Sequence, residues 1–271
     1  MLSVLLFIGC DSAQPAESWS NLAASSYCSE MPMDNRDDCR IEECRSVVET
    51  VGPPTAEDAP ALTTLCEMAE ASNSEGAQYC GLHSCYYLPQ VQVSDAMRIL
   101  QSSLPVSANQ KRARAAILRG LLEQDELFGS ALDGALGAPL KNSSWYGLAV
   151  AEIDCEMAGI SKDLGLGCPT VSADNVQRIL SLADASKGSE ADYHTLLNLA
   201  GAADFSVAAE PLTGVVSSES STQSQQKAAI GAIHVALMRG ERLPKEQVST
   251  WVELCNPPTA LLQSVCAKLL K

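Results

Sequence analysis

Cysteine and histidine are the residues of this chain with the most chemistry to offer. Eleven cysteines and three histidines occur among its 271 residues. Five of these residues could together form a zinc site: Cys39, Cys44, Cys80, His83 and Cys85. We call them the His83 cluster. Structural zinc sites usually pair cysteines two to four residues apart, so the four-residue gaps here allow zinc without favouring it, and disulfides are the competing interpretation.

Catalytic motifs are missing from the sequence. It contains neither a Gly-x-Ser-x-Gly nucleophile turn nor a His-Glu-x-x-His zinc helix, and no two cysteines have the spacing of a thioredoxin-type pair. The glycines at 165 and 167 lead into Cys168 and Pro169 rather than into a helix that could cradle a phosphate. We therefore predict no catalytic residues, no metal and no cofactor, and a protein that is not an enzyme. A zinc-binding protein or an envelope enzyme that uses the His83 cluster is the alternative.

The N-terminus resembles a known type of targeting signal. An apolar run over residues 2–9 ends at Cys10, and a polar stretch over residues 11–15 follows at once. This arrangement resembles the signal of bacterial lipoproteins, although residue 7 is not the usual Leu, residue 8 is not small, and no Lys or Arg precedes the cysteine. The resemblance implies cleavage before Cys10, a diacylglycerol on its thiol, and a location in the bacterial cell envelope, facing the periplasm or the exterior. The alternative is a buried helix start with an ordinary thiol at Cys10.

Export would also account for the remaining cysteines, because disulfides persist outside the reducing cytosol. With Cys10 taken by the lipid, ten cysteines are left for five disulfides. A spacing of ten to thirteen intervening residues can close a helix, a turn and a helix start. This spacing suggests the pairs Cys28–Cys39, Cys66–Cys80, Cys155–Cys168 and Cys255–Cys266, which leaves Cys44 to pair with Cys85.

Charge and hydropathy limit the partners. The formal net charge of −15 opposes nucleic acid, which requires a basic face. Residues 1–90 carry fourteen acidic residues and three arginines, a net charge of −11, and the remainder carries nineteen acidic and fifteen basic residues, a net charge of −4. An acidic front could attract a basic partner or divalent cations, but a solvated, solubilising face is the simpler interpretation. No later stretch reaches the roughly 18 apolar residues of a membrane span. We expect a soluble body that reaches the membrane through its lipid and binds another protein.

Helical periodicity dominates the body of the chain. Aromatic residues make up only 4% of it, and no alternating run of strand length occurs, so an all-α fold with about ten helices is expected. The predicted organisation is a signal segment at residues 1–9, a flexible tether at 10–26 and a disulfide-rich helical domain at 27–271. Within that domain we distinguish an acidic, Cys-rich front at 27–89 from a repeat-like body at 90–271.

Two pairs of segments suggest internal repetition. The sequence of residues 66–69 recurs at 155–158, and each copy is followed by an Arg-Ile-Leu triplet, at 98–100 and 178–180. Residues 110–121 likewise match 226–237 at several positions. Such echoes favour a stack of helix pairs, in which each pair buries its apolar stripe against the next. The second echo is similar to HEAT and armadillo repeats. A compact, irregular helical bundle is the alternative architecture.

Overall fold

The fold is entirely α-helical over the residues that the structure describes. The computed structural model describes residues 18–25, 28, 32–102, 107–136, 144–154 and 160–269. These residues form 15 α-helices and no strand, so the predicted all-α class is confirmed, whereas the expected number of about ten helices is too low. None of these helices combines the length and the hydropathy needed to cross a membrane. Cys10, Cys155 and the expected signal segment lie outside the described residues.

The helices pack as two rows that alternate along the chain. Row A consists of α2 (Arg36–Thr50), α4 (Glu75–Val91), α6 (Ala108–Leu122), α8 (Ser144–Ile153), α12 (Glu190–Ala203), α14 (Gln223–Met238) and α16 (Gln263–Leu269). Row B consists of α1 (Trp19–Ala24), α3 (Ala59–Ala71), α5 (Val93–Gln101), α7 (Asp125–Leu136), α11 (Ala173–Ala185), α13 (Phe205–Ser217) and α15 (Lys245–Leu254). The short helix α10 (Ile160–Asp163) packs against α6.

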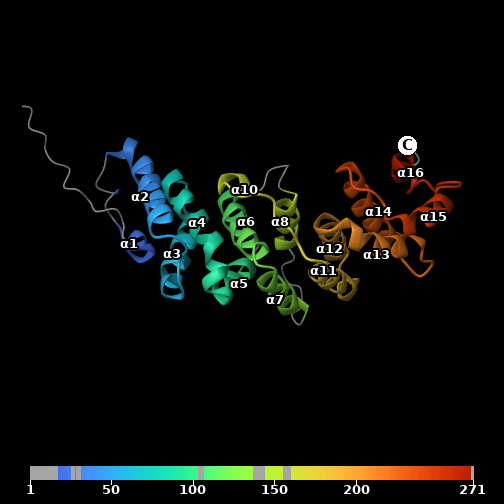
Figure 1. The fold of residues 1–271 in the computed structure, drawn as a ribbon, viewed down its shortest axis with the longest axis horizontal. Coiled ribbons are helices and arrows are strands. Elements are labelled where there is room, and N and C mark those ends of the chain that lie inside the picture. Colours follow the sequence, from blue (N-terminus) through green and yellow to red (C-terminus); the bar gives the residue numbers. More distant parts are fainter. Residues whose placement is uncertain are drawn as a thin grey trace, which may run out of the picture.

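Contacts within the rows make the molecule a stack of helix pairs. Each helix of row A packs against the next helix of that row, from α2 to α16. In row B the contacts run from α1 through α3 to α5, and from α7 through α11 and α13 to α15. Figure 1 shows the rows as a shallow arc, with both ends of the stack above its middle, so that row A follows the inner side. Of the two expected architectures, the structure therefore has the helix-pair stack.

The echo between residues 110–121 and 226–237 falls on equivalent helices. Both α6 and α14 belong to row A and begin with a capping box, in which a hydroxyl and a Gln side chain satisfy each other's backbone N–H groups. Small residues at matching positions are buried in both helices, Ala113 and Ala116 in one and Ala229 and Ala232 in the other. The repeated pattern thus marks the face on which a row A helix meets its neighbours.

The prediction of a flexible tether over residues 10–26 is wrong for part of this range, because Trp19–Ala24 form the helix α1. Ser18 caps this helix through its side chain, and Trp19 and Leu22 are fully buried. The two apolar residues lie three apart, so they share one face, which packs against α3. The Trp19 ring also meets Tyr87 edge-on, with 5.7 Å between ring centroids. Polar composition alone concealed this short amphipathic helix.

Two buried arginines in α6 bind groups outside this helix, and one of them connects the rows. Arg114 is 1% exposed, and its Nε lies 2.9 Å from a carboxylate oxygen of Glu70 in α3. Arg119 is 2% exposed and donates to the Ser161 hydroxyl at 2.9 Å and to the Gly167 carbonyl at 2.8 Å. Buried cations need such partners because leaving them unpaired is costly. The Ala-rich stripe of this helix gave no indication that it would also bury charge.

Candidate functional site

Disulfides join the first helices of the stack. Three bonds connect Cys28 with Cys39, Cys44 with Cys80, and Cys66 with Cys85, and a fourth joins Cys255 to Cys266 near the C-terminus. Cys168 is also disulfide-bonded. The pairing of Cys155 expected from the sequence lies outside the described residues.

The expected bonds Cys28–Cys39 and Cys255–Cys266 are confirmed, whereas the expected pairs Cys66–Cys80 and Cys44–Cys85 are wrong. Cys80 bonds to Cys44 rather than to Cys66, and Cys85 bonds to Cys66 rather than to Cys44. The reason is the position of α4, which packs against α2 on one side and α3 on the other. Cys80 and Cys85 are five residues apart, so they project about 140° apart around the helix and face different neighbours. Short sequence separation is a poor guide once both cysteines lie within one helix.

The same bonds remove the thiols of the His83 cluster. Each of its four cysteines is a disulfide partner, and a disulfide sulfur offers no thiolate to a metal. No group of three or more potential ligands is found among the described residues. The zinc site expected as the alternative therefore does not form at these five residues.

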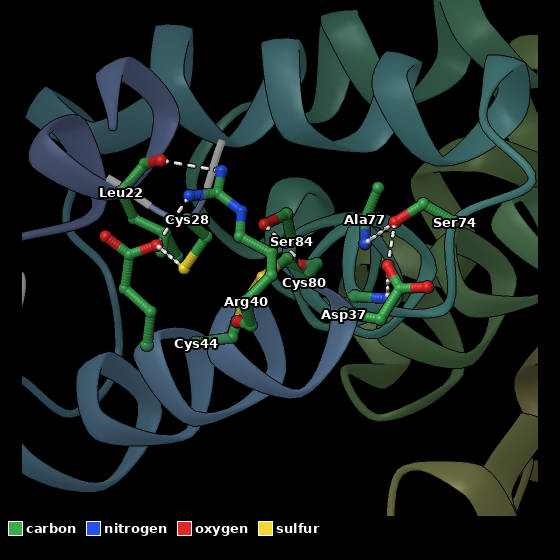
Figure 2. Close-up of a disulfide and its surroundings, with 11 residues drawn as sticks. Leu22, Cys28, Asp37, Arg40, Cys44, Ser74, Ala77, Cys80 and Ser84 are labelled. Atoms are coloured by element: carbon green, nitrogen blue, oxygen red, sulfur yellow. Dashed lines mark hydrogen bonds and ion pairs between the residues drawn. A yellow bond between two sulfur atoms is a disulfide. The ribbon is translucent and has the colours of Figure 1, made fainter. Parts of the chain in front are cut away.

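The surroundings of the Cys44–Cys80 bond hold α2 against α4 (Figure 2). Asp37 accepts hydrogen bonds from the Ser74 hydroxyl and, at 3.2 Å, from the Gly76 N–H, so one carboxylate caps the start of α4. These hydrogen bonds, that of Ser74 first, hold the pKa of Asp37 below its usual value. Arg40 donates to Glu43 at 2.7 Å and to the Leu22 carbonyl at 2.8 Å, which ties α1 to the same network.

A cavity with both polar and apolar side chains in its wall lies on row A beside this network. Its volume is about 460 Å³, and α2, α4, α6 and α10 all contribute to its wall. We call it the row A cavity. The polar and aromatic residues of its wall are Asn73, Glu75, Gln78, Tyr79, His83, Asn109, Arg112 and Asp163. Burial lowers the pKa of His83, which favours its neutral form. The structure thus places the histidine of the predicted zinc cluster in a cavity with amides instead of thiols.

An apolar groove lies at the opposite end of the stack. It has a volume of about 270 Å³ and lies among α14, α15, α16 and the segment before α15. We call it the C-terminal groove. Its wall includes Leu237, Leu243, Val248, Trp251, Val252 and Leu269, with Glu241, Arg242 and Lys268 beside them.

Two valines of the C-terminal groove are unusually exposed for apolar side chains. Val248 and Val252, one helical turn apart in α15, are 46% and 50% exposed. Beneath them Trp251 is 2% exposed and donates its indole N–H to the Thr213 hydroxyl at 2.9 Å. Contiguous exposed apolar surface of this kind marks interaction sites more often than a scatter of single residues does. Sequence reasoning missed this groove because only the packing of α15 decides which of its apolar residues are covered.

Comparisons with protein-family models, with curated proteins and with solved structures find no match to this chain.

Proposed function

We propose that this chain is a non-catalytic, lipid-anchored protein of the bacterial cell envelope that binds another protein. The observation that carries the proposal is the C-terminal groove, an exposed apolar surface at the end of the stack opposite to α1. The lipoprotein-like segment that ends at Cys10 supports the anchor, and the disulfides support an oxidising compartment.

The proposed mechanism is tethering. A lipid on Cys10 would hold the N-terminal end of the chain at a membrane, and the stack would carry the C-terminal groove away from it. Two cations, Arg242 and Lys268, lie beside one carboxylate, Glu241, at the groove, in a chain whose net charge is −15. The partner that fits is therefore a protein segment with apolar side chains and acidic flanks, because such a segment matches both the valines and the cations.

The anchor is tested by replacing its thiol. In native cells, mass spectrometry of the protein should find Cys10 as the first residue, with a diacylglycerol on its sulfur. Cys10→Ser should remove the lipid and move the protein from the membrane fraction to the soluble fraction. Ser12→Ala, which keeps the cysteine, is the matched control and should stay in the membrane fraction. An unprocessed, unacylated amino terminus would contradict the anchor.

The docking surface is tested with a photocrosslinking amino acid at position 252. Met68 in α3 is the matched control position, because it is also apolar and 40% exposed but lies near the other end of the stack. We expect one discrete crosslinked product at position 252, absent at position 68, that weakens when Val248→Glu is added. Products of equal yield at both positions, or a product insensitive to Val248→Glu, would contradict docking at the C-terminal groove.

A further inference from the structure

We propose that the row A cavity binds a small neutral saccharide. The cavity is separate from the C-terminal groove, so this proposal does not rest on the proposed docking of a protein. Its volume of about 460 Å³ lies in the range of small-molecule sites. Three features of its wall identify the ligand class. They are an unpaired buried acceptor, a pair of oriented amides, and a pair of aromatic rings in a wall whose only arginine is already paired.

The unpaired acceptor is the amide oxygen of Gln78. This side chain is 7% exposed, and its Nε2 donates to the Ala69 carbonyl at 3.1 Å and to the Ser72 carbonyl at 2.7 Å. Both amide donors are thus used, and the orientation of the amide is fixed. Its Oε1 is buried and has no hydrogen-bond partner. Since buried acceptors are normally satisfied, this oxygen calls for a donor, and a ligand hydroxyl group reaches it once the side chains that cover it shift.

The oriented amides are those of Asn73 and Asn109. The Nδ2 of Asn109 donates to the Asn73 Oδ1 at 3.0 Å and to the Ser72 carbonyl at 2.8 Å. These bonds leave the oxygen of Asn109 and the amino group of Asn73 for a ligand. One acceptor and one donor side by side suit hydroxyl groups, which both donate and accept.

The charges of the cavity, which include the carboxylates of Glu75 and Asp163, disfavour an anionic ligand. Its only arginine, Arg112, is paired with Asp163 at 2.8 Å, and both side chains are about half exposed. His83 is held towards its neutral form by burial. A phosphate or carboxylate would need a free cation or several N–H donors, which this wall does not supply. The ring centroids of Tyr79 and His83 lie 4.8 Å apart, and these rings offer an apolar surface for the C–H face of a sugar.

The test uses the full-length, oxidised protein and nuclear magnetic resonance titration. The probes are glucose, N-acetylglucosamine and maltose, with inorganic phosphate and lysine as charged comparators. We expect at least one sugar to shift the resonances of Asn73, His83 and Asn109 in a saturable way, and the charged comparators to leave them unchanged. Asn109→Ala should weaken sugar binding about tenfold, the effect of losing one well-placed hydrogen bond.

Two controls keep this test decisive. Asn35→Ala removes an exposed amide that makes no capping hydrogen bond and lies outside the cavity wall, so it should bind sugar as the unchanged protein does. Asn109→Ala should keep the native circular dichroism spectrum, because Gln78 still donates to the Ser72 carbonyl. The proposal is overturned if no sugar shifts these resonances at tens of millimolar, if Asn109→Ala binds sugar unchanged, or if phosphate or lysine produces the shifts instead.

Discussion

The two ends of the stack differ in how polar and how covered their outer helices are. In a stack of helix pairs the end pairs lack one neighbour, so their outer faces must be polar or covered. At the N-terminal end α2 carries eight charged residues among its 15, and three disulfides bind it and its neighbours together. At the C-terminal end α15 carries three charged residues among ten and leaves Val248 and Val252 exposed. The first end is closed by charge, whereas the second offers a surface for contact.

Helix packing differs between the ends as well. In the N-terminal part α4 meets its neighbours at glycines with no room for a side chain. A Cβ on Gly81 would lie 2.2 Å from the Ala69 Cβ, and a Cβ on Gly120 would lie 2.0 Å from the Tyr86 carbonyl oxygen. In the C-terminal part the closest atom to a Cβ on Gly201 would be 3.6 Å away, an ordinary contact with Ala232. Covalent bonds and close glycine contacts therefore occur together around α4.

Reduction of the disulfides should produce the largest difference in stability between the two ends. The three N-terminal bonds span 11, 36 and 19 residues, and each should stabilise the fold by roughly 3 to 4 kcal/mol through loss of chain entropy in the unfolded state. Together they rival the whole stability of a typical domain. After reduction and alkylation, hydrogen exchange should accelerate throughout residues 36–102 and remain slow in residues 205–238.

A double variant provides the control for this prediction. Cys255→Ser with Cys266→Ser removes the single C-terminal bond, and its effect should stay near residues 245–269. Equal loss of protection along the whole stack after reduction would show that the two ends unfold as one unit. Intact protection in residues 36–102 would show that packing alone holds the N-terminal end.

The all-α fold and the matching buried faces of the repeated helices could be predicted from the sequence. Which helices pack against each other could not. Helical spacing of small and apolar residues indicated the all-α fold and the matching faces of α6 and α14. The helices α4 and α13 each contain a proline, Pro89 and Pro211, a residue that local propensity disfavours in a helix interior. Packing on both sides of these helices outweighs the local penalty of proline.

The candidate sites were harder to predict than the helices. The segment around His83 was considered as part of a zinc site, but its two cysteines form disulfides with different helices and its histidine lines the row A cavity. Which neighbour each of these residues faces depends on its angular position around α4. That assignment requires knowing the helices that pack on both sides of α4. The C-terminal groove was missed for a related reason, since Val248 and Trp251 are both apolar residues of α15 and packing alone buries one and exposes the other.

Paired glycine substitutions should sharpen the contrast in packing. Gly81→Ala must push α3 and α4 apart, because its Cβ would also lie 2.7 Å from the Leu65 carbonyl oxygen. We expect a loss of about 1–3 kcal/mol or more in the free energy of unfolding. Gly201→Ala has room for its methyl group and gains helix propensity, so it should be neutral or stabilise by up to about 1 kcal/mol.

Urea unfolding of the oxidised proteins measures both changes. The disulfides must stay intact in both variants, which thiol titration verifies, so that packing is compared and not bond formation. Effects of the same sign and size at Gly81 and Gly201 would contradict the difference in packing between the ends. A stabilising Gly81→Ala would contradict the close contact between α3 and α4 at this glycine.

The smallest effect is expected from the carboxylate that caps α4. The pKa of Asp37 in the folded protein lies below its ordinary value of 3.8, because the Ser74 hydroxyl and the Gly76 N–H bind the ionised form. Its contribution to stability is therefore present above about pH 4 and is lost as the pH falls through the lowered pKa. Asp37→Asn should lower stability at neutral pH by less than about 1 kcal/mol, since the side chain is partly exposed, and should flatten the acid limb of the stability profile.

Asp38→Asn is the matched control for this carboxylate. It changes the same charge one residue along, also in the first turn of α2, but at an exposed position. Any general effect of charge at the start of α2 will be common to both variants. The difference between the pH profiles of the two variants therefore measures the contribution of the Asp37 contact with α4. Identical profiles would show that closing the N-terminal end depends on the disulfides and the glycine contacts and not on this cap.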